Sequence, residues 1–268
     1  MEMILNIVVC FNNKKEIMDY IKKLERIEFS DKLVICVVIN DDTNIEYFGK
    51  KNENIFVYKC KGNSGYLNGA LYGYKSMEGK GYTWKWVIIS NTDIDYPDNQ
   101  FIKKLLGGKY PENAWAIGPD IYCPFTGEHQ NPRYMRRISK KRMKIYLLVY
   151  SNVMSAFLYH MLSTLKKRRG KSNKKDIKVV TQVYLIHGAY MILTEALIGQ
   201  LMVNPFKGLM YHEEQHIAEI VYKNNKKCFF DPALKIVHNE HSSTGKSNFI
   251  EKYKQMKHSY LVNYRMYY

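Results

Sequence analysis

Short apolar runs alternate with helical patterns along the first hundred residues. Four short runs are mostly apolar, as strands buried on both faces are: residues 4–9, 33–39, 55–58 and 87–90. Residues 14–27 repeat apolar side chains at helical spacing, and residues 63–77 begin with glycine and continue as a helical pattern. This alternation predicts βαβ units, and therefore an α/β fold with a mostly parallel, Rossmann-like sheet flanked by helices.

The second half of the chain has shorter patterns. They predict strands over residues 114–117, 184–193, 228–230 and 234–237, and helices over residues 98–106, 213–223 and 246–268. Asp231 and Pro232 separate the last two predicted strands. A chain of 268 residues with 46% hydrophobic residues can build one such domain with a sizeable core.

The net charge of +16 comes from one segment. Residues 133–175 contain 14 of the 41 Lys and Arg and no Asp or Glu, which leaves 27 basic against 25 acidic residues elsewhere. A local basic patch on a near-neutral body favours an anionic surface over a long nucleic-acid groove. We therefore expect no nucleic-acid partner.

The five cysteines are odd in number and widely spaced, and none forms a CxxC pair. This usage predicts buried free thiols in a reducing compartment. The first nine residues lack the basic start and small-residue cleavage site of a signal peptide. We expect a cytoplasmic protein.

Acidic side chains follow two of the predicted strands. Asp41 and Asp42 follow the second strand, and Asp93 and Asp95 follow the fourth. Ligands of open α/β sheets bind at the carboxyl ends of the strands, and Mg²⁺ is typically bound by one or two carboxylates plus substrate phosphates. Asp-x-Asp is therefore a candidate site for a metal with a diphosphate, although Asp is also common in solvated turns.

Seven segments in order resemble glycosyltransferase family 2, especially its rhamnosyltransferase-like branch. They are residues 8–13 (VVCFNN), 40–43 (NDDT), 63–66 (NSGY), 88–95 (IISNTDID), 187–192 (HGAYMI), 211–214 (YHEE) and 236–238 (IVH). The resemblance covers about residues 3–245 and leaves out much of 130–180. Three positions depart from the family pattern: Glu214 stands where the family has Asp, His216 where it has an acid, and Asn40 where Asp is more usual.

The resemblance implies a GT-A fold and an inverting glycosyltransferase that uses a UDP- or dTDP-sugar in bacterial cell-surface polysaccharide assembly. The implied nucleotide-sugar contacts are Asn12, Asp41, Asp42, Asn63, Gly65, Asn68 and Asp93. Mg²⁺ or Mn²⁺ would be bound by Asp93, Asp95 and His238, with Asp95 nearest the metal. Glu214, or in second place Glu213, would be the base that takes the proton from a glycan or lipid-linked acceptor.

The resemblance also implies four parts of the chain: a nucleotide-sugar half (1–130), a basic helical insertion (131–180), an acceptor and catalytic half (181–245) and a C-terminal helix (246–268).

A competing motif lies in the same segment. His212 and His216 frame a His-Glu-x-x-His pattern that could bind zinc on one helix face, with Glu213 as base and Glu240 downstream as a third ligand. A zinc metallopeptidase is therefore the alternative enzyme. It leaves the glycine loop and the acidic turns before residue 130 unexplained.

Residues 145–165 contain no Asp, Glu, Lys or Arg and are flanked by basic clusters. The length permits a transmembrane helix, but a single span would put Asp93 and Glu214 on opposite sides of the membrane. We expect an amphipathic helix at the inner face of the cell membrane, or a helical hairpin packed on the domain. A non-enzymatic basic membrane-binding module would explain this patch but not the acidic strand ends.

Overall fold

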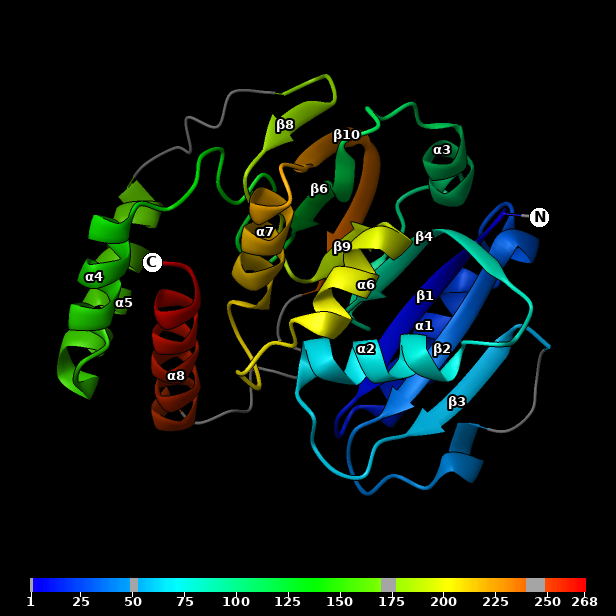
Figure 1. Ribbon diagram of the computed structural model, residues 1–268, viewed down its shortest axis with the longest axis horizontal. Helices are drawn as coiled ribbons and strands as arrows, with labels where there is room; N and C mark the ends of the chain where they lie inside the picture. Colours follow the sequence, from blue (N-terminus) through cyan, green and yellow to red (C-terminus); the bar gives the residue numbers. More distant parts are fainter. Residues whose placement is uncertain (1, 49–52, 170–176, 240–248) are drawn as a thin grey trace.

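The computed structural model describes residues 2–48, 53–169, 177–239 and 249–268. Its centre is one sheet of ten strands in the order β3-β2-β1-β4-β9-β6-β10-β5, with β7 beside β6 and β8 beside β10 (Figure 1). The predicted α/β fold is confirmed, with helices on both faces of the sheet.

The four predicted apolar runs form the parallel half of the sheet. They are β1 (Glu2–Cys10), β2 (Leu33–Ile39), β3 (Ile55–Lys59) and β4 (Thr83–Ser90). All three pairings among them are parallel. Every residue of β2 is buried, which explains why its sequence is continuously apolar.

The other half of the sheet is mixed. Strand β9 (Tyr190–Leu193) is antiparallel to both β4 and β6 (Ala114–Cys123), and β6 is parallel to β10 (Lys227–His238). Three short strands complete it: β5 (Ile94–Asp95), β7 (Glu128–His129) and β8 (Thr181–Val183). Strand β9 runs antiparallel to both β4 and β6, so β6 and β10 point in the same direction as β4. The carboxyl end of β10 therefore lies at the same edge of the sheet as those of β1, β2 and β4.

Two predicted strand boundaries were wrong. The run 184–193 is not one strand, because only its last four residues pair in the sheet as β9. The predicted break at Asp231 and Pro232 is instead a bulge within β10, where the register with β6 shifts between Asp231 and Lys235. A bulge leaves the strand continuous, so proline is tolerated there.

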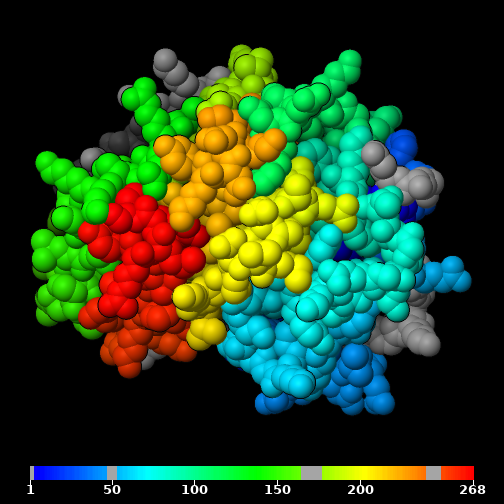
Figure 2. Space-filling model, in the orientation of Figure 1, coloured from blue at the N-terminus to red at the C-terminus, as the bar shows by residue number. Residues whose placement is uncertain are grey.

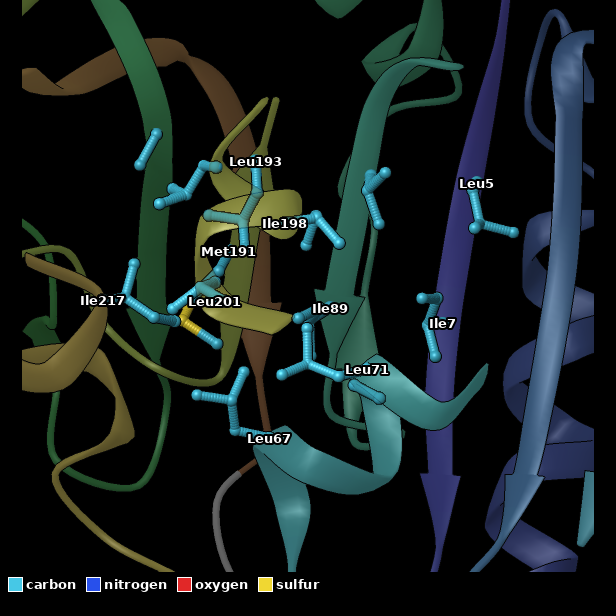
Figure 3. Close-up of a cluster of buried hydrophobic side chains, with 14 of the residues drawn as sticks. Leu5, Ile7, Leu67, Leu71, Ile89, Met191, Leu193, Ile198, Leu201 and Ile217 are labelled. Carbon is cyan, nitrogen blue, oxygen red and sulfur yellow. The ribbon is translucent and has the colours of Figure 1, made fainter. Parts of the chain in front are cut away.

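Two hydrophobic clusters cover the two faces of the sheet. Helices α1 (Lys14–Leu24) and α3 (Phe101–Gly107) pack on one face. Helices α2 (Tyr66–Ser76), α6 (Glu195–Val203) and α7 (Glu213–Lys223) pack on the other (Figure 3). Two short 3-10 turns, Ser30–Lys32 and Ile45–Phe48, flank β2. All five cysteines are buried and none forms a disulfide, as predicted.

The basic segment forms two helices and not the single helix predicted over 145–165. Helix α4 (Lys140–Val149) ends before α5 (Val153–Arg169), and the two are bent by 113°. The Asn152 side chain begins the second helix by accepting a hydrogen bond from the Ser155 amide at 2.9 Å. In the described part of the chain no single helix is long and apolar enough to cross a membrane; this bent pair meets the length and composition criteria only together.

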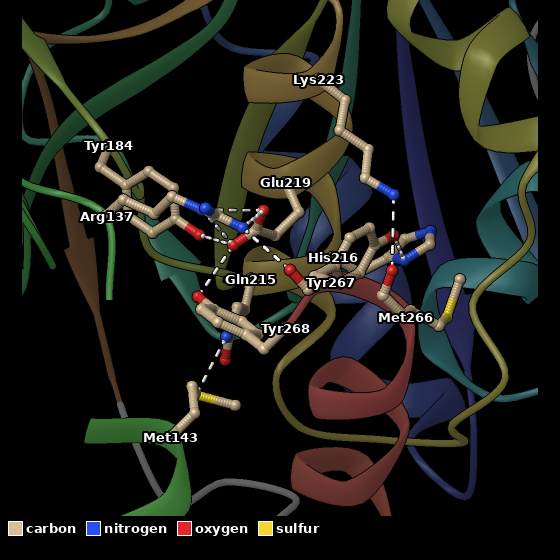
Figure 4. A network of polar contacts seen from close by, with 10 residues as sticks. All are labelled: Arg137, Met143, Tyr184, Gln215, His216, Glu219, Lys223, Met266, Tyr267 and Tyr268. Atoms are coloured by element: carbon tan, nitrogen blue, oxygen red, sulfur yellow. Dashed lines mark hydrogen bonds and ion pairs between the residues drawn. The ribbon is translucent and has the colours of Figure 1, made fainter. Parts of the chain in front are cut away.

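Helix α8 (Phe249–Tyr267) lies between this helix pair and the main domain (Figure 2). A third hydrophobic cluster joins α4, α5 and α8, and includes Tyr146, Tyr150, Tyr253 and Tyr260. Polar contacts attach α8 to α7 (Figure 4). The fully buried carboxylate of Glu219 on α7 accepts hydrogen bonds from Arg137, Tyr184 and Tyr268 at 2.7–3.1 Å.

Candidate active site

A cavity of about 720 Å³ opens beyond the carboxyl ends of β1, β2 and β3. Four of the predicted nucleotide contacts line it: Asn12, Asp41, Asp42 and Asn63. Its size lies within the range of small-molecule sites. The lining residues that were not predicted include Phe11, Lys59 and Lys61. Phe11, which is 46% exposed, gives the cavity an aromatic surface, and the lysines give it positive charge.

Asp41 is oriented by the backbone around it. Its carboxylate accepts hydrogen bonds from the amides of Asn12 at 2.5 Å and Thr43 at 2.8 Å. Partial burial alone would raise the pKa of Asp41, but these hydrogen bonds outweigh burial and lower the pKa below its usual value. Asp41 is therefore an ionised acceptor at the mouth of the cavity, suited to a ribose hydroxyl or a base N–H.

The glycine loop before α2 is built around buried Asn40. The Asn40 side chain accepts a hydrogen bond from the Ser64 amide at 2.8 Å and donates to the Asn63 side chain and the Gly65 carbonyl. Asn63 in turn accepts from the Gly65 amide at 2.9 Å. Asn63 therefore lines the cavity and also shapes the loop.

Gly65 and Asn68 contact the segment before α7. Gly65 has φ +80°, and a Cβ there would lie 2.3 Å from the Leu209 carbonyl oxygen. The Asn68 side chain donates to the Phe206 carbonyl at 2.7 Å. Because the Tyr66 amide also donates to Leu209, protein backbone occupies the start of α2. Two of the predicted nucleotide-sugar contacts, Gly65 and Asn68, therefore contact the segment between α6 and α7.

Asp93 lies beside His238 at the ends of β4 and β10. The Asp93 Oδ1 and His238 Nε2 atoms are 3.3 Å apart, and both side chains are largely buried. The His238 Nδ1 contacts the Gln130 side-chain oxygen at 2.8 Å, and this contact orients the ring with Nε2 toward Asp93. Asn91 contacts the same nitrogen at 3.4 Å. A carboxylate oxygen and an imidazole nitrogen thus lie side by side.

Asp95 is oriented differently from Asp93. Its carboxylate makes an ion pair with Lys23 of α1 and accepts a hydrogen bond from the Asn239 side chain at 2.6 Å. The structure therefore brings together Asp93 and His238, but not Asp95, which was expected to lie nearest the metal. In the described parts of the chain no three His, Cys, Asp or Glu side chains converge on one point.

Glu213 and Glu214 are the first two residues of α7. A Cβ added to Gly188 would lie 3.4 Å from the Glu214 Oε2, so this carboxylate covers the segment that leads into β9. Arg133, at the start of the basic segment, lies 3.5 Å from the Glu214 Oε1. Sequence reasoning did not identify Arg133, because only the fold brings it to α7.

Glu213 is more buried than its neighbour. Burial, and then the charge of Glu214, raise the pKa of Glu213 to about 8. Burial also raises the pKa of Tyr66 well above its usual value, with further effects from the charges of Glu213 and Asp93. The Tyr66 hydroxyl is buried without a hydrogen-bond partner among the described residues.

The His-Glu-x-x-His pattern does not form a zinc site. His216 has both ring nitrogens engaged, with Nε2 on the Asn204 carbonyl at 2.8 Å and Nδ1 on the Tyr267 hydroxyl at 2.5 Å. The His212 ring stacks on Tyr260 with centroids 3.9 Å apart. Glu240, the proposed third ligand, lies outside the described residues. Because both nitrogens of His216 are engaged, the described residues do not offer the paired histidines that a zinc metallopeptidase needs.

A scan against protein-family models and a search of curated proteins give no match. Two solved structures are similar over most of this chain. One is a mannosyltransferase from Pyrobaculum calidifontis in complex with GDP-Man and Mn²⁺, with a TM-score of 0.52, 12% identity and 90% of this chain covered. The other is GalNAc-T7 with UDP, GalNAc and Mn²⁺, with a TM-score of 0.56, 10% identity and 95% covered.

The present chain spans 58% and 47% of the lengths of those two chains. At these identities the likeness shows the fold alone. The predicted GT-A architecture is therefore confirmed: a central sheet flanked by helices, with the candidate site at the carboxyl ends of its strands.

Proposed function

We propose that this protein is a metal-dependent glycosyltransferase that uses a nucleoside-diphosphate sugar as donor. One observation carries the proposal: an open cavity at Asp41, the Asp93–His238 pair and Glu214 all lie at one edge of a GT-A sheet. Both similar solved structures contain Mn²⁺ together with a nucleotide or nucleotide sugar, which supports the same ligand classes here.

Asp93 and His238 are the residues that would bind the metal. A carboxylate and an imidazole suit Mn²⁺, and a site with two protein ligands leaves positions for diphosphate oxygens. When bound, the metal would neutralise charge on the leaving diphosphate. Gln130 contacts the other ring nitrogen of His238 and so orients the ring toward Asp93. Asp95, by contrast, joins β5 to α1 through Lys23.

Glu214 is the better candidate for the base. It takes the proton of the acceptor hydroxyl while that oxygen attacks the sugar carbon and the nucleoside diphosphate leaves, which inverts the anomeric centre. Its carboxylate lies beside Gly188 and is oriented by Arg133. Glu213 is buried and, with a pKa of about 8, carries its proton at neutral pH. Glu213 therefore contributes to the environment of Glu214 and not to proton transfer.

The donor and the biological role rest on the resemblance to glycosyltransferase family 2. The ordered motifs favour the rhamnosyltransferase-like branch, a UDP- or dTDP-sugar, and the assembly of a bacterial cell-surface polysaccharide. Asp41, as an ionised acceptor at the cavity mouth, suits the ribose or the base N–H of any of these nucleotides. A donor screen should therefore also include GDP-sugars.

The test is release of nucleoside diphosphate from UDP-, dTDP- and GDP-sugars with Mn²⁺, with and without added acceptor glycans. We expect turnover of at least one donor, and a loss of about 10²–10⁴-fold in Glu214→Gln because the base is removed. Glu195→Gln is the matched control, since Glu195 is an exposed carboxylate on α6 that bonds Tyr74. Absence of turnover for every donor, or full activity in Glu214→Gln, would contradict the proposal.

A further inference from the structure

The α4–α5 pair presents an apolar surface to solvent. Five side chains of α5 recur at helical spacing and are exposed: Met154, Phe157, Leu158, Met161 and Leu162. Ile145, Leu148 and Val153 extend this surface across the bend. Leu148, Met154 and Leu162 are each more than 60% exposed. We call these eight side chains the apolar elbow. A contiguous exposed apolar patch on a folded domain marks an interaction site.

The pattern of α5 is the reverse of an ordinary surface helix. Its inward side carries Ala156 and His160, and the His160 ring nitrogen contacts the Tyr150 hydroxyl at 2.8 Å. Burial lowers the pKa of His160, so the imidazole is neutral inside the pair. Apolar residues face water while a polar ring faces the protein. Covering the outer face with another apolar phase would therefore be favourable, because it would remove these side chains from water.

The surroundings of the elbow are positively charged. Lys140, Lys141 and Lys144 lie exposed on α4. No Asp or Glu occurs anywhere in residues 133–175. A second copy of this chain would bring the same cations to the contact, and like charges would repel. An anionic lipid surface offers both an apolar layer and negative headgroups.

We propose that the apolar elbow docks on the surface of an anionic lipid bilayer, with the lysines of α4 at the headgroups. Helices that lie in the interface bury their apolar side into the headgroup boundary and bind more strongly to anionic lipids. Arg133, which contacts Glu214, begins the same basic segment. The docking itself does not depend on the proposed function.

The test is flotation of the full chain with vesicles of phosphatidylcholine alone or with phosphatidylglycerol at about one third. Binding is compared for wild type, Met154→Ser/Leu158→Ser/Leu162→Ser and Lys140→Gln/Lys141→Gln/Lys144→Gln. Phe125→Ser/Val203→Ser is the matched control, because both side chains are exposed apolar residues away from the elbow. Thermal unfolding of each variant shows that the fold is retained.

We expect wild type and control to bind anionic vesicles, and to lose most binding in vesicles of phosphatidylcholine alone or at high salt. Each triple variant should lower the partition coefficient by about tenfold or more, since the apolar and electrostatic contributions add. Equal binding of the Met154→Ser/Leu158→Ser/Leu162→Ser variant would overturn the proposal. So would absence of wild-type binding, or a concentration-dependent dimer that this variant makes monomeric, because a second copy would then cover the elbow.

Discussion

Glu213 and Glu214 are neighbours in sequence but differ in what surrounds them. Glu214 lies beside Gly188 and Arg133, whereas Glu213 is only 6% exposed and its pKa is raised to about 8. The first turn of α7 thus presents one carboxylate to the site and buries the other. The pair is a clear case in which identical residue types acquire different chemistry from the fold.

Glu213 should make stability depend on pH. Its pKa is about 8 when folded against an ordinary 4.5, so the folded state binds the extra proton. Its stabilising effect is present in full below pH 4.5 and is lost as pH rises from 4.5 through 8. Glu213→Gln resembles the protonated acid and does not titrate. We expect it to match wild type at pH 5 and to be more stable at pH 9 by about 2–5 kcal/mol, measured by urea unfolding. If the free energies of unfolding of Glu213→Gln and wild type differed by the same amount at pH 5 and pH 9, this account would be contradicted.

At the scale of elements, the start of α2 contacts the segment that precedes α7, and we call this contact the junction. Gly65 makes the close approach to Leu209 possible, and Asn68 bonds Phe206 across the same junction. Tyr66, which follows Gly65, has a buried hydroxyl whose pKa is raised first by burial and then by the charge of Glu213. The position of α2 and the environment of the candidate base are therefore coupled.

Gly65→Ala tests this junction. The backbone at φ +80° and ψ 177° suits only glycine, and the added Cβ would meet backbone oxygen and not a movable side chain. We expect a loss of about 2–4 kcal/mol in the free energy of unfolding. Gly199→Ala is the matched control: it lies in α6 with open space around the new Cβ, and should be neutral or stabilising by up to about 1 kcal/mol. Equal effects of the two substitutions would show that the junction is not constrained.

At the scale of the whole molecule, the sequence predicted the half of the fold whose strands have uninterrupted or nearly uninterrupted apolar runs. The runs of β1, β2 and β4 are apolar because both faces of the sheet are covered, so their pattern alone identified them. The short strand β9 and the bend between α4 and α5 were not predictable. They depend on pairing with distant strands and on packing against α8, neither of which leaves a local pattern.

The candidate site was likewise predicted only in part. The acidic strand ends were identifiable because carboxyl ends of parallel strands meet at one edge. Sequence could not tell which carboxylate of Asp93 and Asp95 faces His238, because β5 pairs with β10 only in the fold. Phe11 and Arg133 were missed for a similar reason: their neighbours in space lie far along the chain.

The most direct test of the account is calorimetric titration of UDP, dTDP and GDP, with and without Mn²⁺, into wild type, Asp93→Asn and Asp95→Asn. The two substitutions are chemically matched and lie two residues apart, but only Asp93 faces His238. We predict Mn²⁺-dependent binding of at least one nucleotide, weakened on the order of a hundredfold in Asp93→Asn and by a few-fold at most in Asp95→Asn. A reversed ranking would contradict the metal assignment, and no binding of any nucleotide to wild type with Mn²⁺ would contradict the proposed function itself.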